Sequence, residues 1–421
     1  MFERTTLDNG LRIVTSSMPH THSVCVSLFI GTGSRYEAME YAGISHFIEH
    51  LCFKGTERRP TAKELAETID GIGGVLSGVT DKELTMYSAK VARPHFPIAL
   101  DLLADMLRNS RFDLADIETE RKVIIEELNM CFDSPQGRVE MLIDEVIWPD
   151  QPLGRDIAGS KDSVATIDRP AIIEYVTGNY VPNNIVVSVA GDIRHSEVVD
   201  SVAQTLGDLP TMEPPQWLPA NNSQDNVRFV TEKRKTEQAH LCLAVRGISH
   251  SHPDRFVLDL LNLILGEGMS SRLFLEIRER LGLAYDVHSH TNHFHDSGSV
   301  NIYAGVDPKR IEDAIEAILN ELMKLKEMPV PEAEITKAKE LGKGRLMLRM
   351  EDTRSVAGWI GGQELLLDRI RTVDEVVSIL ESVSSENIQQ VAQDIFKKDG
   401  LCFVMVGPSR KEKGLEKLLS L

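Results

Sequence analysis

The sequence predicts an α+β protein made of two homologous domains, each a largely antiparallel sheet packed with helices, joined by a linker. Strand-like and helix-like segments mix along the 421 residues without strict strand–helix–strand alternation. Three short segments of the first half recur in the second half, in order, at an offset of about 216 residues. A polar, proline-rich stretch without apolar periodicity separates the halves.

The recurring segments are two strand-like runs and the beginning of one helix, paired as 86–91 with 301–306, 116–123 with 333–340, and 185–191 with 401–407. One short match carries little weight, but three in order at one offset indicate a duplicated domain. We therefore expect a first domain over 1–209, a linker over 210–226 and a second domain over 227–421.

Local patterns predict the elements of the first half. Apolar runs or alternation predict strands at 11–15, 24–30, 85–91 and 185–190. Apolar residues at helical spacing predict helices at 61–70, 96–109, 116–130, 172–177 and 195–206. In each domain we expect the helices on one face of the sheet.

The composition excludes some functions. The chain is 42% hydrophobic and 26% charged, an ordinary globular balance, and its net charge of −18 disfavours nucleic acid. No stretch reaches the length of a membrane span, and the N-terminus lacks an apolar signal region, so we expect a cytoplasmic protein with no membrane partner. Five scattered cysteines without C-x-x-C spacing are expected to be reduced core residues.

The spacing His46-x-x-Glu49-His50 indicates metal chemistry. Residues i, i+3 and i+4 of a helix share one face, so two imidazoles stand one turn apart with a carboxylate beside them. Such histidines can hold one zinc ion at about 2.0 Å from each nitrogen, and three protein ligands leave a position for water. An adjacent glutamate can accept the proton of that water, as in the inverted form of the metalloprotease motif.

An amphipathic helix with ordinary surface or core histidines is the alternative interpretation. The flanking residues Phe47, Ile48 and Leu51 are apolar, which favours a largely buried helix. A buried group of two histidines and a glutamate needs a charge partner, which a cation supplies.

A third ligand must come from another element. The acidic helix at 116–130 offers four carboxylates, Glu118, Glu120, Glu126 and Glu127. Glu120 and Glu127 are seven residues apart and lie on one face. A solvated acidic stripe explains the same pattern without a ligand, so the residues alone leave both interpretations open.

Two stretches together resemble the zinc motif of the pitrilysin and mitochondrial processing peptidase family: His-Phe-Ile-Glu-His at 46–50 and Glu-Arg-Lys-Val-Ile-Ile-Glu-Glu at 120–127. In that family the third ligand is a glutamate with about 76 residues between it and the second histidine, and a glutamate seven residues earlier supports the site. The resemblance implies these roles by position: Zn2+ ligands His46, His50 and Glu127, general base Glu49, and supporting residue Glu120.

The resemblance extends through the whole chain. Residues 7–11 resemble the opening strand of the family, and residues 270–285 resemble its second-domain signature. In that signature an arginine and a tyrosine seven residues apart reach the substrate from the half without metal, which implies such a role for Arg278 and Tyr285. Without the family they would be interpreted as a helix-surface arginine and a strand tyrosine.

The chain also departs from the family and from its own repeat. Where the family usually has Asn-Ala, close to its substrate-binding edge strand, this chain has Ser77-Gly78. The second half lacks the histidine motif near Asn262, and Gly344 stands where Glu127 would map. Only the first half is therefore expected to bind metal.

A second group of histidines needs an explanation: His288, His290, His293 and His295, with Asp296 beside them. Alternate strand positions place His288 and His290 on one face. A second metal site is one interpretation, and polar residues that line a chamber or its rim are the other.

The resemblance implies a zinc-dependent endopeptidase that cleaves extended peptides or small unfolded proteins inside a closed chamber of four such domains. This chain supplies two domains, so we expect a homodimer or a heterodimer with a related inactive subunit. A catalytically inactive structural subunit of a processing-peptidase-like complex is the alternative, and a zinc hydrolase acting on a non-peptide bond also fits the residues.

Overall fold

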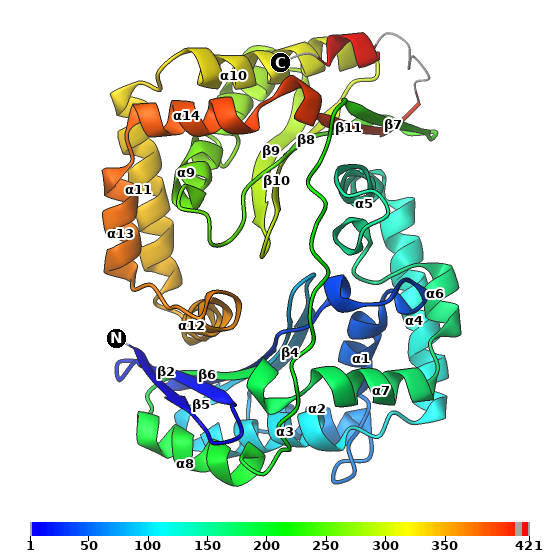
Figure 1. Cartoon of the computed structure of the whole chain (residues 1–421), viewed down its shortest axis with the longest axis vertical. Helices are drawn as coiled ribbons and strands as arrows, with labels where there is room; N and C mark the ends of the chain where they lie inside the picture. The colour runs from blue at the N-terminus through cyan, green and yellow to red at the C-terminus, as the bar shows by residue number, and fades with distance from the viewer. Residues whose placement is uncertain (1, 409–414, 420–421) are drawn as a thin grey trace. The chain divides into compact units, whose positions relative to one another are not determined.

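The computed structural model describes residues 2–408 and 415–419. It divides into two compact units, each with one sheet and its own helices (Figure 1). Unit 1 contains Met1–Leu128, Arg155–Leu218 and Met347–Thr372, and unit 2 contains Asn129–Gly154, Pro219–Leu346 and Val373–Leu421. None of the described helices is long and apolar enough to cross a membrane.

The sheet of unit 1 has the strand order β1-β2-β6-β3-β5-β4. Its neighbours run antiparallel except for the parallel pair β2 and β6. Its strands are β1 (Phe2–Thr6), β2 (Arg12–Ser17), β3 (Ser23–Ile30), β4 (Val75–Thr80), β5 (Thr85–Ala92) and β6 (Ile185–Gly191). Its helices are α1 (Ile44–Cys52), α2 (Ala62–Asp70), α3 (Phe96–Asn109), α4 (Leu114–Asp133), α6 (Lys161–Thr166), α7 (Arg169–Asn179), α8 (His195–Leu206) and α12 (Thr353–Leu367).

The sheet of unit 2 has the order β7-β11-β8-β10-β9, with one parallel pair, β7 and β11. Its strands are β7 (Arg228–Lys233), β8 (Ala239–Arg246), β9 (Ala284–His293), β10 (Gly298–Val306) and β11 (Cys402–Gly407). Its helices are α5 (Pro135–Ile147), α9 (Arg255–Leu265), a π-helical segment (Phe274–Arg280), α10 (Ile311–Glu327), α11 (Glu332–Arg349), α13 (Val373–Ser382) and α14 (Ser385–Ile395).

The two sheets correspond strand by strand. Taken in sheet order, β2, β6, β3, β5 and β4 match β7, β11, β8, β10 and β9, and the parallel pair has the same place in both. The repeated runs 86–91 and 301–306 lie in β5 and β10, and the runs 185–191 and 401–407 lie in β6 and β11. The predicted α+β class with two largely antiparallel sheets is confirmed.

Both faces of each sheet are covered, which corrects the expectation of helices on one face. In unit 1, Val24, Val26 and Leu28 of β3 face the core formed with α3, while Cys25 and Phe29 face α12. In unit 2, helix α5 packs on β8 and β11. Each sheet therefore takes one helix from the other half of the sequence: α12, in the second half, covers the sheet of unit 1, and α5, in the first half, covers the sheet of unit 2.

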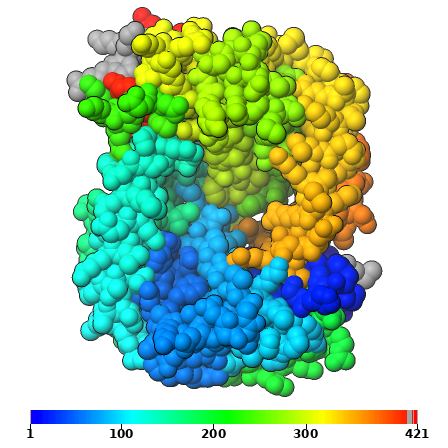
Figure 2. Space-filling model, turned by 180° about the vertical axis from the view of Figure 1, so that it is seen from behind, coloured from blue at the N-terminus to red at the C-terminus, as the bar shows by residue number. Residues whose placement is uncertain are grey.

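Helix α12 lies close to its sheet because glycine allows it. A Cβ atom built at Gly361 would overlap the ring of Phe29 and lie 2.7 Å from Cβ of Ser188. At the edge of the same face, Arg4 of β1 forms an ion pair with Glu364 at 2.9 Å. Figure 2 shows these dark blue and orange parts of unit 1 side by side.

The predicted division into 1–209, 210–226 and 227–421 follows the sequence and stays a prediction. The stretch 210–226 contains no helix or strand. The compact units cross this division through α5 and α12.

The start of α1 is set by a buried carboxylate and a glycine. The backbone N–H of Gly43 donates to Oε2 of Glu37 at 2.7 Å, and that of Ser45 donates to Oε1 at 2.9 Å. Gly43 has a φ of 95°, a left-handed conformation that favours glycine. Glu37 is only 2% exposed and satisfies N–H groups that a helix leaves without partners at its first turn.

We expect Glu37 to make the stability of unit 1 depend on pH. Burial raises the pKa of Glu37 to about 7 from an ordinary value of 4.5, against the opposing effect of the Gly43 and Ser45 hydrogen bonds. Because the folded pKa is the higher one, the folded protein binds the proton more tightly, and stability falls as the pH rises from about 4.5 to about 7. Across this window the free energy of unfolding of the wild type should fall by roughly 3 kcal/mol relative to that of Glu37→Gln.

Urea unfolding of both proteins with a chelator present, at several pH values across the window, measures this difference. Glu40→Gln, a change at an exposed glutamate of the same loop, is the control and should keep the wild-type slope. Equal pH slopes for wild type and Glu37→Gln would contradict the expectation.

Candidate metal centre

Helix α1 places the two histidines of the motif on one face. Its apolar residues Phe47, Ile48 and Leu51 are buried in the core of unit 1, as the sequence predicted. His46 and His50 lie on the less buried side, with side chains 19% and 18% exposed. Their ring centroids are 4.6 Å apart with an interplanar angle of 70°, so the rings stand edge to face.

Glu127 of α4 reaches the two imidazoles. Its Oε2 atom lies 3.8 Å from Nε2 of His46 and 3.5 Å from Nε2 of His50. Two donors on one tetrahedral zinc ion are separated by roughly 3.3 Å, so these distances suit the ion closely. Within 2–408 and 415–419 these three residues are the one group whose donor atoms could converge on a metal ion.

His50 is oriented by a second glutamate. Nδ1 of His50 lies 3.0 Å from Oε2 of Glu120, which holds the proton on Nδ1 and leaves the lone pair of Nε2 directed at Glu127. The other oxygen of Glu120 accepts from Nζ of Lys54 at 2.6 Å. Glu120 is 3% exposed, and these two partners satisfy its buried charge.

His46 is held differently. Its Nδ1 atom is buried and has no hydrogen-bond partner among the described residues. Burial, helped by the nearby His50, lowers the pKa of His46 to about 4. The imidazole is therefore neutral near neutral pH, which is the form that binds metal ions. Two neutral imidazoles and one carboxylate are a donor set that fits zinc.

Glu49 stands beside these donors and contacts strand β4. Its Oε2 atom accepts a hydrogen bond from Oγ1 of Thr80 at 2.6 Å. Burial raises the pKa of Glu49 above its usual range, and the hydrogen bond from Thr80 acts in the opposite direction. A carboxylate with a raised pKa is suited to take and return a proton.

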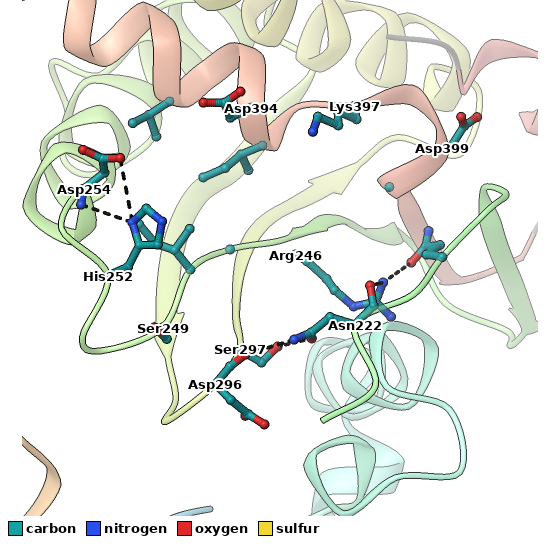
Figure 3. A pocket seen from close by; sticks show the side chains of 16 residues that line it. Asn222, Arg246, Ser249, His252, Asp254, Asp296, Ser297, Asp394, Lys397 and Asp399 are labelled. Carbon is teal, nitrogen blue, oxygen red and sulfur yellow. Dashed lines mark hydrogen bonds and ion pairs between the residues drawn. The ribbon is translucent and has the colours of Figure 1, made fainter. Parts of the chain in front are cut away.

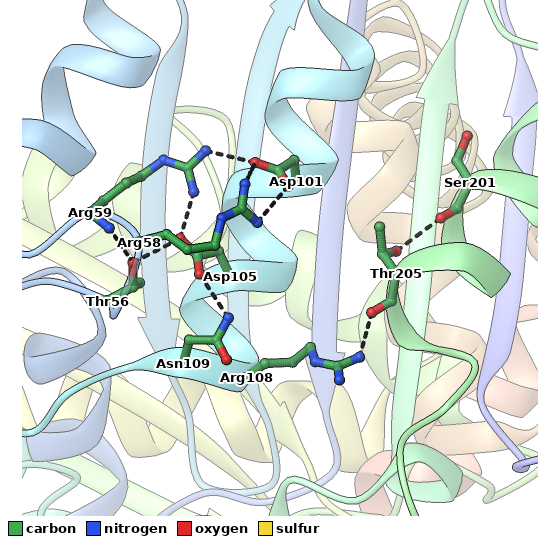
Figure 4. A network of polar contacts seen from close by, with 9 residues as sticks. All are labelled: Thr56, Arg58, Arg59, Asp101, Asp105, Arg108, Asn109, Ser201 and Thr205. Atoms are coloured by element: carbon green, nitrogen blue, oxygen red, sulfur yellow. Dashed lines mark hydrogen bonds and ion pairs between the residues drawn. The ribbon is translucent and has the colours of Figure 1, made fainter.

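The chain that follows α1 is anchored on α3 by a network of polar contacts (Figure 4). Arg58 forms two hydrogen bonds of 2.8 Å with the carboxylate of Asp101. Thr56 donates to the buried Asp105 at 2.7 Å, and Arg59 donates to the same carboxylate at 2.5 Å. This network fixes the C-terminal end of the segment that carries the histidines.

Arg278 and Tyr285 lie together in unit 2. Arg278 is in the π-helical segment and Tyr285 is in β9. The guanidinium carbon of Arg278 is 4.8 Å from the ring centroid of Tyr285 and 4.7 Å from that of Phe274. Tyr285 is 77% exposed, so its hydroxyl is available to another molecule.

The donor atoms of the histidine group in unit 2 do not converge. His288 packs on Tyr303 with ring centroids 5.1 Å apart, and His290 contacts the side chain of Asn301. His293 is bound between the carbonyl of Ile248 and the carboxylate of Asp259. Among the described residues this group therefore offers no second metal site.

A hollow of about 800 Å³ lies in unit 2, between the loop after β8, the turn between β9 and β10, and the end of α14 (Figure 3). Several of its polar side chains bind one another or the backbone. Arg246 donates to the carbonyls of Asn222 and Ile147, and His252 accepts from the backbone N–H of Asp254.

Four of the five cysteines are buried, as predicted, but Cys131 is exposed, so the prediction is wrong for that residue. Burial raises the pKa of Cys52 to about 11, and this neutral thiol in the core is no metal ligand. Glu118, one of the four candidate carboxylates of the acidic helix, is paired with Arg121 at 3.1 Å.

Sequence reasoning missed three residues of the site: Lys54, Thr80 and Glu37. Lys54 stands four residues after His50, and this spacing could have indicated it. Thr80 and Glu37 reach α1 only through the folded chain, so no local pattern marks them.

Comparison with known proteins agrees with this geometry. Residues 12–161 match the family model described as "Insulinase (Peptidase family M16)", and residues 166–341 match "Peptidase M16 inactive domain". "Uncharacterized zinc protease YmxG" of Bacillus subtilis (strain 168) is 37% identical over 414 residues, which cover 97% of this chain and 99% of that protein. "Uncharacterized zinc protease SCO5738" of Streptomyces coelicolor is 35% identical over 93% of this chain and 86% of its own length.

A solved structure shares the fold. The crystal structure of a protease from Helicobacter pylori superposes with a TM-score of 0.92 at 24% identity, covering 97% of this chain and 99% of that one. The two family models together span most of the chain, and the relatives match both halves. The chain therefore belongs to peptidase family M16, the pitrilysin-type family that its zinc motif resembles.

Proposed function

We propose that this protein is a zinc-dependent endopeptidase that cleaves extended peptides or small unfolded proteins inside a closed chamber. The observation that carries the proposal is the approach of His46, His50 and Glu127 to within 4.8 Å of one another, with Glu49 beside them. Membership in peptidase family M16 and relatives named zinc proteases support it.

In this proposal His46, His50 and Glu127 hold the ion, and Glu120 with Lys54 keeps His50 in place. When bound, zinc acts as a Lewis acid that polarises the scissile carbonyl and lowers the pKa of water. Glu49 accepts the proton of the attacking water and passes it to the leaving amine.

The substrate class follows from an open sheet edge. Strand β4 pairs with β5 on one side, and no described strand pairs with its other side. Helix α1 packs against β4, so this edge is close to the metal centre. An extended peptide can add to such an edge through backbone hydrogen bonds, without a particular partner side chain. Val75 and Val79 of β4 are 54% and 45% exposed, which leaves apolar side chains available to the peptide.

Substitutions in the motif test the proposal. Glu49→Gln should retain zinc and lower the turnover of an unfolded peptide by at least about a hundredfold, because the proton acceptor is lost. His46→Ala should lose both zinc and turnover. Metal analysis and a peptide assay measure the two effects. Glu118→Gln, a change at an exposed glutamate of α4, is the control. Full activity in Glu49→Gln would end the proposal, and bound zinc without hydrolysis of any peptide in a broad library would favour a structural subunit.

Arg278 and Tyr285 are proposed to stabilise the oxyanion or to hold carbonyls of the substrate. Tyr285→Phe removes only the hydroxyl and should reduce kcat/KM by about a hundredfold, the usual cost of one such donor. The zinc content should not change. Tyr36→Phe provides the control, because it removes the hydroxyl of a tyrosine in unit 1. Unaltered kcat/KM in both Tyr285→Phe and Arg278→Ala would remove these residues from the mechanism.

The chamber requires four domains of this type, and we propose that this chain forms it as a homodimer or as a heterodimer with a related inactive subunit. Light scattering at working concentration should give twice the mass of one chain for the purified protein. A strict monomer with full activity would exclude the homodimer and the paired chamber together.

A further inference from the structure

We propose that strand β4 positions the catalytic base, with Thr80 as the positioning residue and Gly78 as the gap in which the carboxylate lies. This inference rests on the proposed function, in which Glu49 is the general base. It adds two residues to that function.

The first observation is the hydrogen bond between Thr80 and Glu49. Oγ1 of Thr80 donates to Oε2 of Glu49 at 2.6 Å, and both side chains are partly buried. A short hydrogen bond to a charged acceptor is among the stronger ones. Glu49 has three rotatable side-chain bonds, so without this bond its carboxylate would sample several positions. Thr80 therefore links the base on α1 to the end of β4.

The second observation is the space at Gly78. A Cβ atom built there would lie 2.6 Å from Oε1 of Glu49, 2.9 Å from its Cγ and 2.9 Å from Cε2 of Phe53. Such distances are too short for non-bonded atoms, so any side chain at this position displaces the carboxylate or the ring. Phe53 packs against Tyr87 with ring centroids 6.1 Å apart and lies against the core of unit 1, which limits how far the ring can move.

Backbone conformation does not require this glycine. Gly78 is absent from the residues of positive φ, so another residue could adopt its backbone angles. Glycine weakens the interior of a strand and often marks a close approach of another group. The close approach here is the side chain of Glu49, which makes space the reason for the glycine.

The two contacts assign separate tasks to the two oxygens of Glu49. Oε2 accepts the hydrogen bond from the hydroxyl of Thr80, and the proposal assigns Oε1 as the oxygen that accepts the proton of water. Oε1 is also the atom that a side chain at Gly78 would press upon. Thr80 fixes the direction of the carboxylate, and Gly78 keeps its free oxygen accessible.

Two substitutions at Thr80 separate positioning from strand packing. If the hydroxyl positions Glu49, Thr80→Val should lower kcat at least about tenfold with little change in KM or zinc content, while Thr80→Ser should stay within about threefold of wild type. If Thr80 only supports the strand, the order reverses, because valine is a better strand residue than serine. Thr68→Val, which removes the hydroxyl of a partly exposed threonine in α2, is the control.

Gly78→Ala tests the gap. It should lower kcat at least about tenfold while zinc content is retained, since the added methyl group displaces Oε1. Gly178→Ala, a change at a glycine of α7 where an added Cβ atom has nothing within 4 Å, is the matched control and should leave kcat unchanged. Wild-type kcat in both Gly78→Ala and Thr80→Val would overturn the inference while the proposed function stands. A wild-type protein without peptidase activity would instead contradict the proposed function.

The hydrogen bond between Thr80 and Glu49 can also be tested without measuring catalysis. Thermal unfolding of the metal-free proteins is compared for wild type, Thr80→Val, Glu49→Leu and the double variant. Because both single changes remove the same hydrogen bond, the double variant should shift the midpoint by less than the sum of the two single shifts. Additive shifts would overturn the role of Thr80.

Discussion

The hydrogen bond between His50 and Glu120 is the contact on which the rest of the centre depends. It ties α1 to α4, so the helix with both histidines and the helix with Glu127 keep a fixed separation. It also places the proton on Nδ1, which leaves the lone pair of Nε2 for a metal ion. Lys54 completes the contact by satisfying the second oxygen of a carboxylate that has almost no access to water.

This contact also satisfies the charge of a carboxylate that is almost fully buried. A buried carboxylate without partners would cost several kcal/mol or would take up a proton. Here the imidazole and the ammonium supply two donors, so Glu120 remains in place as an acceptor. The burial of His46 keeps the second imidazole neutral, which is the form that binds a metal ion. Oε2 of Glu127 lies 3.5 Å from Nε2 of His50 and 3.8 Å from Nε2 of His46.

The sequence predicted the parts of the centre that follow local periodicity. His46 and His50 are one helical turn apart, and Glu120 and Glu127 are two turns apart, so helix geometry alone gives the shared faces. Choosing Glu127 over Glu118 or Glu126 required the family resemblance, because all four carboxylates lie on one helix. Thr80 and Glu37 could not be predicted in this way, since β4 and the loop before α1 reach the helix only through tertiary packing.

Local sequence patterns predicted the fold within the same limit. Strands β3, β5 and β6 and helices α2, α3 and α8 have clear patterns and were predicted close to their observed bounds. The sequence did not predict that α5 covers the sheet of unit 2 and α12 the sheet of unit 1. Both helices have one apolar side, and the sequence does not say which sheet that side covers. Their positions also follow the duplication, since α12 begins about 218 residues after α5.

The duplication provides an internal comparison for the gap beside Glu49. In unit 1, Gly78 of β4 pairs with Tyr87 of β5, and in unit 2, Ser289 of β9 pairs with Ile302 of β10. Tyr87 and Ile302 are equivalent in the repeated runs, so Ser289 occupies the place of Gly78.

At the equivalent position of the helices, the larger residue lies in unit 1 and the glycine lies in unit 2. At the repeat offset Glu49 corresponds to Leu265 and His50 to Gly266, and a Cβ atom built at Gly266 would overlap the side chain of Ser289. The space between helix and strand is thus filled from the helix in unit 1 and from the strand in unit 2. When a side chain of one element fills this space, the facing residue of the other element is a glycine, because close-packed interiors leave no room for two side chains.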